Sequence, residues 1–138
     1  MRYYLDTNIL IFILLNENDE IDKHVVDILN DYSNTFYVSP IAVKELLHLY
    51  KTGDIKDNYY KSAGYLLQAI ENYGIEIKPL NKYHLAAYAR LGILKGHKDP
   101  NDHVIIAQAI TDKISLISSD TKFKSYTAQG LQFIFNKR

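Results

Sequence analysis

The chain has 138 residues, of which 47% are hydrophobic and 23% are charged, a composition typical of a soluble globular protein. Its length allows a buried core without structural crosslinks, and the absence of cysteine excludes both a disulfide framework and a thiolate metal site. Sixteen basic and sixteen acidic residues give a formal net charge of zero, so the chain lacks the basic excess common in nucleic-acid-binding proteins.

Two kinds of apolar segment alternate along the chain. Short apolar runs predict buried strands, and apolar residues at helical spacing predict helices. In chain order, the sequence predicts a strand at residues 3–5, helices at 7–15 and 19–32, a strand at 36–38, helices at 40–50 and 56–73, a strand at 75–77, helices at 83–95 and 100–111, and strands at 115–117 and 131–135.

Several predicted helix ends carry suitable capping residues. Ser39 before Pro40 fits an N-cap with proline at the first helical position, and Gly74 and Gly96 are each predicted to end the helix before them. Strands that alternate with helices predict a mostly parallel sheet covered on both faces. Because the chain has no linker or repeat, we expect residues 1–138 to form one three-layer α/β/α domain.

No segment has the length of a membrane span. The longest apolar run, residues 9–15, is too short to cross a bilayer, and the N-terminus lacks a signal-peptide cleavage pattern. We therefore expect a cytoplasmic protein without a membrane partner.

Two aspartates follow predicted strands. Asp6 comes directly after the first strand and Asp120 comes shortly after the fourth. Ligands of an open parallel sheet gather outside the carboxyl ends of its strands, so we expect both carboxylates at one rim. Each also has a purely structural explanation, because Asp6 would cap the helix that begins at Thr7 and the composition of residues 118–121 suits a turn.

Three further acids lie at predicted helices. Asp99 before Pro100 fits an N-cap, and Asp102 takes the place of a capping-box acid. Asp102 also falls on the apolar face of its helix, where an unpaired acid is costly. Glu45 lies at the edge of the apolar arc of its helix, where a surface salt bridge explains it about as well as a functional site does.

Carboxylates that converge at one rim repel one another. Two like charges about 4 Å apart repel by about 4 kcal/mol at an effective dielectric constant of about 20, so such a group takes up protons or collects a divalent cation. Oxygen ligands without cysteine or evident paired histidines suit Mg²⁺ or Mn²⁺ rather than zinc.

Two other enzyme classes with an aspartate after a strand fit less well. A phosphotransferase of the haloacid-dehalogenase kind needs a second acid two residues after the first, and this position holds Asn8. A receiver-like phosphoacceptor domain places its aspartate later in the chain and uses a lysine from a late strand. The order of residues here supplies neither.

Four segments together carry a family resemblance. They are Tyr4-Leu5-Asp6-Thr7-Asn8, Ser39-Pro40 through Glu45-Leu46, His97-Lys98-Asp99-Pro100-Asn101-Asp102 with its continuation to Ala109, and Ile117-Ser118-Ser119-Asp120 followed by Lys122-Phe123. Their order and spacing and the total length resemble the PIN-domain family, in particular its VapC-type toxins, over essentially the whole chain.

The resemblance implies a five-stranded parallel sheet between helices, with an acidic pocket at its carboxyl rim. The acidic quartet of the family, implied to be catalytic and to hold Mg²⁺ or Mn²⁺, matches Asp6, Glu45, Asp102 and Asp120. The positions implied to support these carboxylates match Thr7, Asp99 and Ser119, of which Asp99 serves mainly as the cap of its helix.

The resemblance also implies an endoribonuclease that is the toxin of a bacterial VapBC-like toxin–antitoxin pair. In-line attack of water on the phosphodiester would leave a 5′-phosphate and a 3′-hydroxyl. The implied partners are a transfer, ribosomal or messenger RNA, a cognate antitoxin that inserts a segment into the groove, and a second copy of the chain. Two alternatives stay open: a non-catalytic PIN-shaped module that binds RNA or protein, and a nuclease acting on structured DNA.

Basic residues around the third segment, together with one in the second, are candidate contacts to the RNA backbone. They are Lys44, Arg90, Lys95, His97 and Lys98. A solvated surface explains the individual lysines equally well. The main departure from the family is Asn101-Asp102-His103, where relatives more often carry an aromatic residue before the acid and arginine after it.

Overall fold

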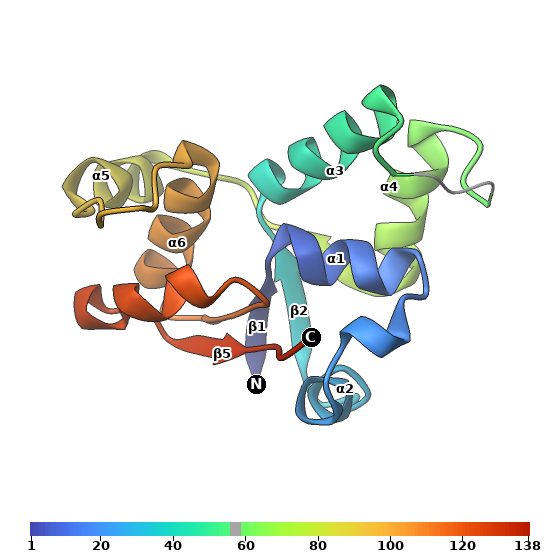
Figure 1. The fold of residues 1–138 in the computed structure, drawn as a ribbon, viewed down its shortest axis with the longest axis horizontal. Coiled ribbons are helices and arrows are strands. Elements are labelled where there is room, and N and C mark those ends of the chain that lie inside the picture. Colours follow the sequence, from blue (N-terminus) through green and yellow to red (C-terminus); the bar gives the residue numbers. More distant parts are fainter. Residues whose placement is uncertain (56–58) are drawn as a thin grey trace.

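Five strands form one parallel sheet in the computed structural model, which describes residues 1–55 and 59–138 (Figure 1). Their order across the sheet is β3-β2-β1-β4-β5, and every neighbouring pair is parallel. The strands are β1 (Arg2–Leu5), β2 (Thr35–Val38), β3 (Ile75–Ile77), β4 (Ser115–Ser118) and β5 (Phe133–Phe135). The predicted five-stranded parallel sheet is confirmed.

Helices connect the strands and cover both faces of the sheet. The α-helices of the described residues are α1 (Thr7–Leu14), α2 (Lys23–Leu29), α3 (Pro40–Thr52), α4 (Ala63–Asn72), α5 (Lys82–Arg90) and α6 (Pro100–Asp112), and two 3-10 helices are η1 (Asn18–Glu20) and η2 (Thr121–Gln129). Figure 1 shows α5 and α6 on one side of the sheet and α1, α2 and α4 on the other. Within the described residues, none of the helices combines the length and the apolar character needed to cross a membrane.

The central strands separate two hydrophobic cores. Successive side chains of a strand point to opposite faces of its sheet, and in β1 Tyr3 and Leu5 belong to one core while Tyr4 belongs to the other. The first core is completed by α1, α2, α3 and α4, and the second by α6 and η2. This arrangement is the predicted three-layer architecture.

Two predicted helices are shorter than the sequence pattern indicates. Residues 19–32 form η1 and then α2, because Asp22 caps α2 by accepting a hydrogen bond from the backbone N–H of Val25. The predicted helix at 56–73 begins at Ala63, after its N-cap Ser62. Its first residues, 56–58, lie outside the described part of the chain.

The predicted helix at 83–95 ends at Arg90 rather than before Gly96. The backbone that follows finds partners on η2 instead of continuing the helix. Gly92 donates to Gln129 Oε1 at 2.8 Å and accepts from Gln129 Nε2 at 2.9 Å. The η2 helix itself was not predicted, and Gly96 lies in a turn with φ of +85°.

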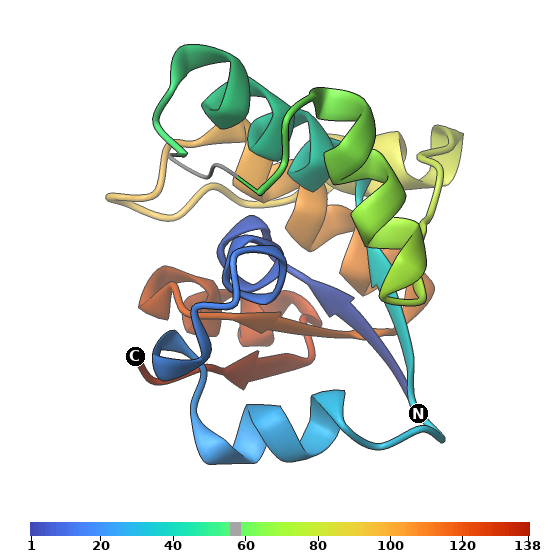
Figure 2. The same ribbon diagram turned by 90° about the vertical axis from the view of Figure 1, so that its right-hand side faces the viewer.

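Two predicted helix ends are confirmed. Ser39 caps α3 by accepting from the backbone N–H of Ile41 at 3.1 Å, with Pro40 at the first helical position. Gly74 follows α4 with φ of +76°, a left-handed conformation that glycine adopts without steric cost. The C-terminal segment lies beside η1 (Figure 2), where Asn136 Nδ2 donates to the carbonyl oxygen of Glu20 at 2.7 Å.

Candidate metal-binding active site

The carboxyl rim of the sheet gathers acids from four segments of the chain. Asp6 follows β1, and its backbone N–H still donates to Ile117 of β4 at 3.0 Å. Asp120 comes two residues after the end of β4. The first turn of α6 supplies Asp102 and the second turn of α3 supplies Glu45.

Asp6 is held by three hydrogen bonds in a buried position. Its carboxylate accepts from the backbone N–H of Thr7 at 2.8 Å, from Ser118 Oγ at 2.7 Å and from Asn8 Nδ2 at 3.2 Å. Burial raises the pKa of Asp6 to about 7, although the Ser118 hydrogen bond opposes the shift, and the negative charge of Asp102 raises it further. Asp6 is therefore the N-cap of α1, and its carboxyl group has a pKa close to neutral pH.

Glu45 lies opposite the start of α1. Its carboxylate accepts a hydrogen bond of 2.7 Å from Thr7 Oγ1, which ties α3 to α1. Burial raises the pKa of Glu45 against the effect of this hydrogen bond, and the charge of Asp99 adds to the rise. Thr7, one of the three residues predicted to support the acids, is thus in direct contact with Glu45.

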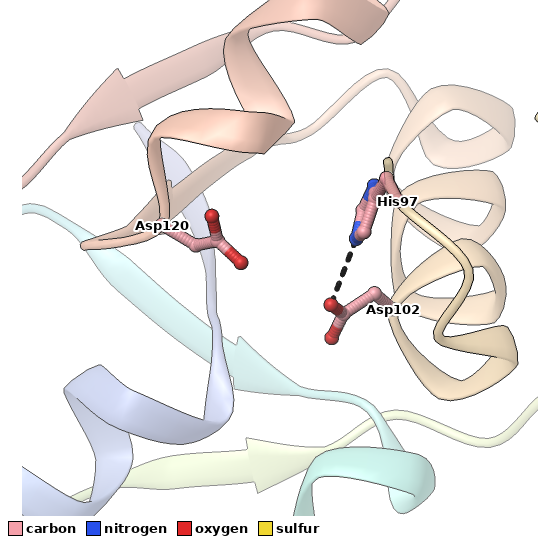
Figure 3. Close-up of side chains that lie close together, drawn as sticks. All are labelled: His97, Asp102 and Asp120. Atoms are coloured by element: carbon pink, nitrogen blue, oxygen red, sulfur yellow. Dashed lines mark hydrogen bonds and ion pairs between the residues drawn. The ribbon is translucent and has the colours of Figure 1, made fainter. Parts of the chain in front are cut away.

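Asp102 and Asp120 face one another from α6 and the end of β4, with the ring of His97 beside Asp102 (Figure 3). His97 Nε2 lies 2.9 Å from Asp102 Oδ2. One ligand atom from each of these three residues lies within 4.8 Å of the other two. Burial raises the pKa of Asp102 to about 7, and the charges of Asp99, Glu45 and Asp120 contribute to the rise.

The two other predicted supporting residues have partners outside the four acids. Asp99 is the N-cap of α6 and accepts from the backbone N–H of Asn101 at 2.9 Å. It nevertheless lies close to the acids, since ligand atoms of Glu45, Asp99 and Asp102 lie within 4.8 Å of one another. Ser119 Oγ accepts from Asn136 Nδ2 at 2.7 Å.

Sequence reasoning missed Ser118, whose hydroxyl reaches Asp6. The alternation of strand side chains contains the signal. Tyr4 of β1 pairs with Leu116 of β4, and two residues further on each strand stand Asp6 and Ser118. Residues i and i+2 of a strand share a face, so Ser118, and not Ser119, lies on the side of Asp6.

The basic candidates for RNA contact divide into two groups. Lys44, Arg90, Lys95 and Lys98 are exposed. His97 is only 4% exposed, and its two ring nitrogens contact Tyr126 and Asp102. It therefore belongs to the acidic rim rather than to a basic surface, which the spacing of basic residues alone does not reveal.

A hollow adjoins the acids on the side of α3. It has a volume of about 380 Å³ and is lined by Lys44, Glu45, His48, Leu49 and Asn101. A larger cleft of about 460 Å³ lies near α1 and α2, and apolar and amide side chains line it without any of the four acids. The smaller hollow is thus the one beside the candidate site.

The geometry of the rim fits a divalent cation. Ligands of an octahedral Mg²⁺ stand about 2.1 Å from the ion and so up to about 4.2 Å apart, close to the separation of up to 4.8 Å between carboxylate oxygens of Asp102 and Asp120. Burial raises the pKa values of Asp6 and Asp102, and the charges of neighbouring acids add to the rise, so a bound cation would stabilise their ionised forms. The rim can therefore hold a metal ion.

A three-layer fold with an acidic site at the carboxyl rim of a parallel sheet defines the class of this protein. The profile of the PIN domain family matches residues 3–128, so the chain belongs to the PIN domain family. PIN domains are generally nucleases. No curated protein matches the chain significantly.

Solved structures with a similar fold include several VapBC proteins. A chain of VapBC2 from Rickettsia felis, bound to a DNA fragment from their promoter, has a TM-score of 0.73 at 21% identity, and the match covers 99% of this chain and 100% of that one. A chain of VapBC-1 from nontypeable Haemophilus influenzae has a TM-score of 0.63 at 23% identity, with 98% of each chain covered. A chain of VapBC-5 from Mycobacterium tuberculosis, a member of the VapBC family of toxin-antitoxin systems, has a TM-score of 0.64 at 14% identity, with coverage of 99% and 98%.

Proposed function

We propose that the chain is an endoribonuclease that depends on Mg²⁺ or Mn²⁺ and is the toxin of a VapBC-like toxin–antitoxin pair. The observation that carries the proposal is the convergence of acids at the rim of a PIN-domain sheet, where Glu45 and Asp120 each lie within metal-ligand spacing of Asp102 and the charges of Asp102 and Glu45 act on Asp6. Membership of a family of nucleases and the similarity to VapBC structures support it.

Each acid has a defined part in the proposed reaction. Asp6, Asp102 and Asp120 hold the ion, and Glu45 completes the set or orients the attacking water. When bound, the ion supplies Lewis-acid stabilisation of the scissile phosphate and lowers the pKa of the attacking water. Because Asp6 and Asp102 have pKa values of about 7, both carboxyl groups give up protons as the site fills.

The exposed cations position the RNA backbone beside these acids. Lys44 lies in the hollow next to Glu45, and Lys95 and Lys98 lie on the segment that leads from α5 to Asp99. Arg90, at the end of α5, completes this group. The RNA is a transfer, ribosomal or messenger RNA.

The proposal includes two protein partners and a cytoplasmic location. A cognate antitoxin blocks the groove, and a second copy of the chain forms a homodimer. VapBC structures similar to this chain support the first partner, and the family resemblance of the sequence implies the second. The molar mass of the purified protein in solution tests the homodimer directly.

Cleavage of purified transfer, ribosomal and messenger RNA tests the enzymatic proposal. The wild-type protein is expected to give discrete fragments with Mg²⁺ or Mn²⁺ and none with a chelator. Asp120→Asn keeps an oxygen that caps η2 and is expected to lose cleavage, whereas Asp27→Asn, at an exposed ion pair on α2, retains it. A folded wild-type protein that cuts none of the RNAs contradicts the proposal and favours a binding module, and cleavage of structured DNA alone favours the DNA nuclease.

Expression in a bacterial host tests the assignment as a toxin. Wild-type protein is expected to arrest growth, and the Asp120→Asn variant at the same expression level is expected not to. Growth that continues while the wild-type protein accumulates and its extracted RNase activity is intact contradicts the toxin assignment and leaves the nuclease in place.

A further inference from the structure

The ring of His97 lies between two side chains of unlike chemistry. Its Nε2 lies 2.9 Å from Asp102 Oδ2, and its Nδ1 lies 3.0 Å from the hydroxyl of Tyr126. Both His97 and Tyr126 are buried, at 4% and 0% exposed. The metal-binding rim is thus joined to the core beneath η2 by one continuous line of polar contacts.

The contacts at Tyr126 favour one tautomer of His97. The Tyr126 hydroxyl oxygen accepts from the backbone N–H of Leu94 at 3.4 Å, and its proton is available to donate to His97 Nδ1, 3.0 Å away. In this tautomer the one proton of the neutral imidazole is on Nε2, which donates to the carboxylate of Asp102.

The position of His97 is also fixed from its backbone. His103 Nε2 lies 2.9 Å from the carbonyl oxygen of His97, and the two rings meet edge to face with their centroids 4.9 Å apart. The ring of Phe123 packs against the His97 ring with a centroid distance of 5.5 Å. The His97 ring is contacted at both nitrogens and by neighbouring rings, and the backbone of the residue is hydrogen-bonded. The ring therefore has little freedom to turn.

We propose that His97 is a positioning residue that fixes the carboxylate of Asp102 for metal binding, with Tyr126 setting the ring tautomer. The proposal rests on the proposed metal-dependent function of the rim. One Asp102 oxygen receives the His97 proton, and the carboxylate faces Asp120 across the rim (Figure 3). The rival role is direct coordination of the ion by a His97 nitrogen, since His97, Asp102 and Asp120 together have metal-ligand spacing.

Mn²⁺ affinity measured by isothermal titration, without RNA, tests the positioning role. Gln places its amide nitrogen near the site of His Nε2 and retains a donor for Asp102, whereas Asn reaches only the site of Nδ1. His97→Asn is expected to weaken Mn²⁺ binding about 10- to 100-fold, as loss of a hydrogen bond to a metal ligand does, and His97→Gln is expected to stay within about 3-fold of wild type. Equal affinity in all three proteins overturns the proposal, and wild-type protein that binds no Mn²⁺ overturns the metal-dependent function as well.

Two further measurements keep the proposal testable if His97→Asn folds poorly. Tyr126→Phe removes only the hydroxyl and is expected to weaken Mn²⁺ binding about 10-fold. Its circular dichroism spectrum should match that of the wild-type protein. Pulsed electron paramagnetic resonance of Mn²⁺ bound to the wild-type protein is expected to show no directly coordinated nitrogen. A strong ¹⁴N coupling that His97→Gln removes shows that His97 is a ligand and overturns the positioning role.

Discussion

The carboxyl group of Asp6 has an environment that favours its neutral form. It is 4% exposed, and Asp102 and Glu45 add negative charge nearby. Three hydrogen-bond donors compensate this only in part, since the pKa remains at about 7. Without a cation, ionising this group and Asp102 therefore costs stability.

The pH dependence of stability follows from the sign of these shifts. The folded-state pKa values of Asp6 and Asp102 are about 7, above the ordinary value of 3.8. The stabilising contribution of each protonated group is fully present below about pH 4 and is lost as the pH rises through about 7. A divalent cation reverses this loss by binding the ionised forms.

Asp6→Asn is expected to unfold at a higher temperature than the wild-type protein in chelator at neutral and higher pH. The difference should shrink toward about pH 4, because protonated Asp6 then resembles the amide. Saturating Mn²⁺ should reverse the order, since a ligand at 100 times its Kd stabilises the wild-type fold by about 2.7 kcal/mol. Thermal unfolding across this pH range measures all three effects, and a difference that does not vary with pH contradicts the pKa assigned to Asp6.

Sequence reasoning at the residue scale could place acids but not hydrogen-bond partners. Asp6 and Asp120 follow strands, so their common rim follows from the parallel sheet. His97 sits in a basic run, and nothing in its spacing shows that the ring turns inward to Asp102 and Tyr126. Such contacts depend on the path of a connecting segment, which local patterns do not specify.

At the scale of elements, the first turn of α6 combines two tasks. Asp99 caps the helix by accepting from the backbone N–H of Asn101, and Asp102 one turn into the helix faces the rim. The Asp99 charge also raises the pKa values of Asp102 and Glu45. Asp99 therefore has a structural role and an electrostatic one, and two substitutions separate them.

Asp99→Ala is expected to lower the free energy of unfolding by about 1 kcal/mol, because an N-cap acceptor is lost, whereas Asp99→Asn retains the cap and should stay within a few tenths of a kcal/mol. Urea unfolding measures both changes. If Asp99 acts mainly as a cap, Asp99→Asn also keeps RNA cleavage within a few-fold of wild type. Loss of cleavage in a fully stable Asp99→Asn protein would instead place Asp99 among the metal-holding groups.

Helix ends were predicted well where local chemistry defines them. The Ser39 cap fixes the start of α3, and Gly74 fixes the position where α4 gives way to β3. The end of α5 was missed because its cause is distant in sequence: Gln129 binds the backbone of Gly92. The η2 helix was missed as well, since residues 121–129 have no clear helical periodicity of apolar residues.

At the scale of the whole molecule, the zero net charge conceals an uneven distribution. Four of the sixteen acids lie at the rim, which leaves sixteen basic against twelve acidic residues elsewhere. A bound cation therefore removes much of the repulsion that the rim exerts on a phosphate chain. We expect RNA affinity to be modest and to depend on the metal.

The affinity of the Asp120→Asn variant for single-stranded RNA is expected to fall as salt rises. The slope of log affinity against log salt concentration should be no steeper than about −3, because about four cations contact phosphates and each contributes about −0.7. Lys44→Ala in that background should make the slope shallower by about 0.7. Lys113→Ala, an exposed lysine at the opposite end of α6, should not change it. Fluorescence anisotropy over a salt series measures the slopes, and equal effects of the two lysines contradict the placement of RNA beside Glu45.

The chemical nature of the RNA ends tests the central claim most directly, because that claim is hydrolysis by water at a metal-holding carboxylate rim. Fragments made by the wild-type protein with Mg²⁺ are expected to carry a 5′-phosphate and a 3′-hydroxyl, which ligation to adaptors and mass spectrometry identify. Fragments with a 2′,3′-cyclic phosphate, or fragments that persist in chelator and in Asp120→Asn, would contradict the account. A cyclic phosphate would show that the RNA 2′-hydroxyl attacks in place of water, and persistence in chelator and in Asp120→Asn would show that cleavage needs neither the metal nor the acids.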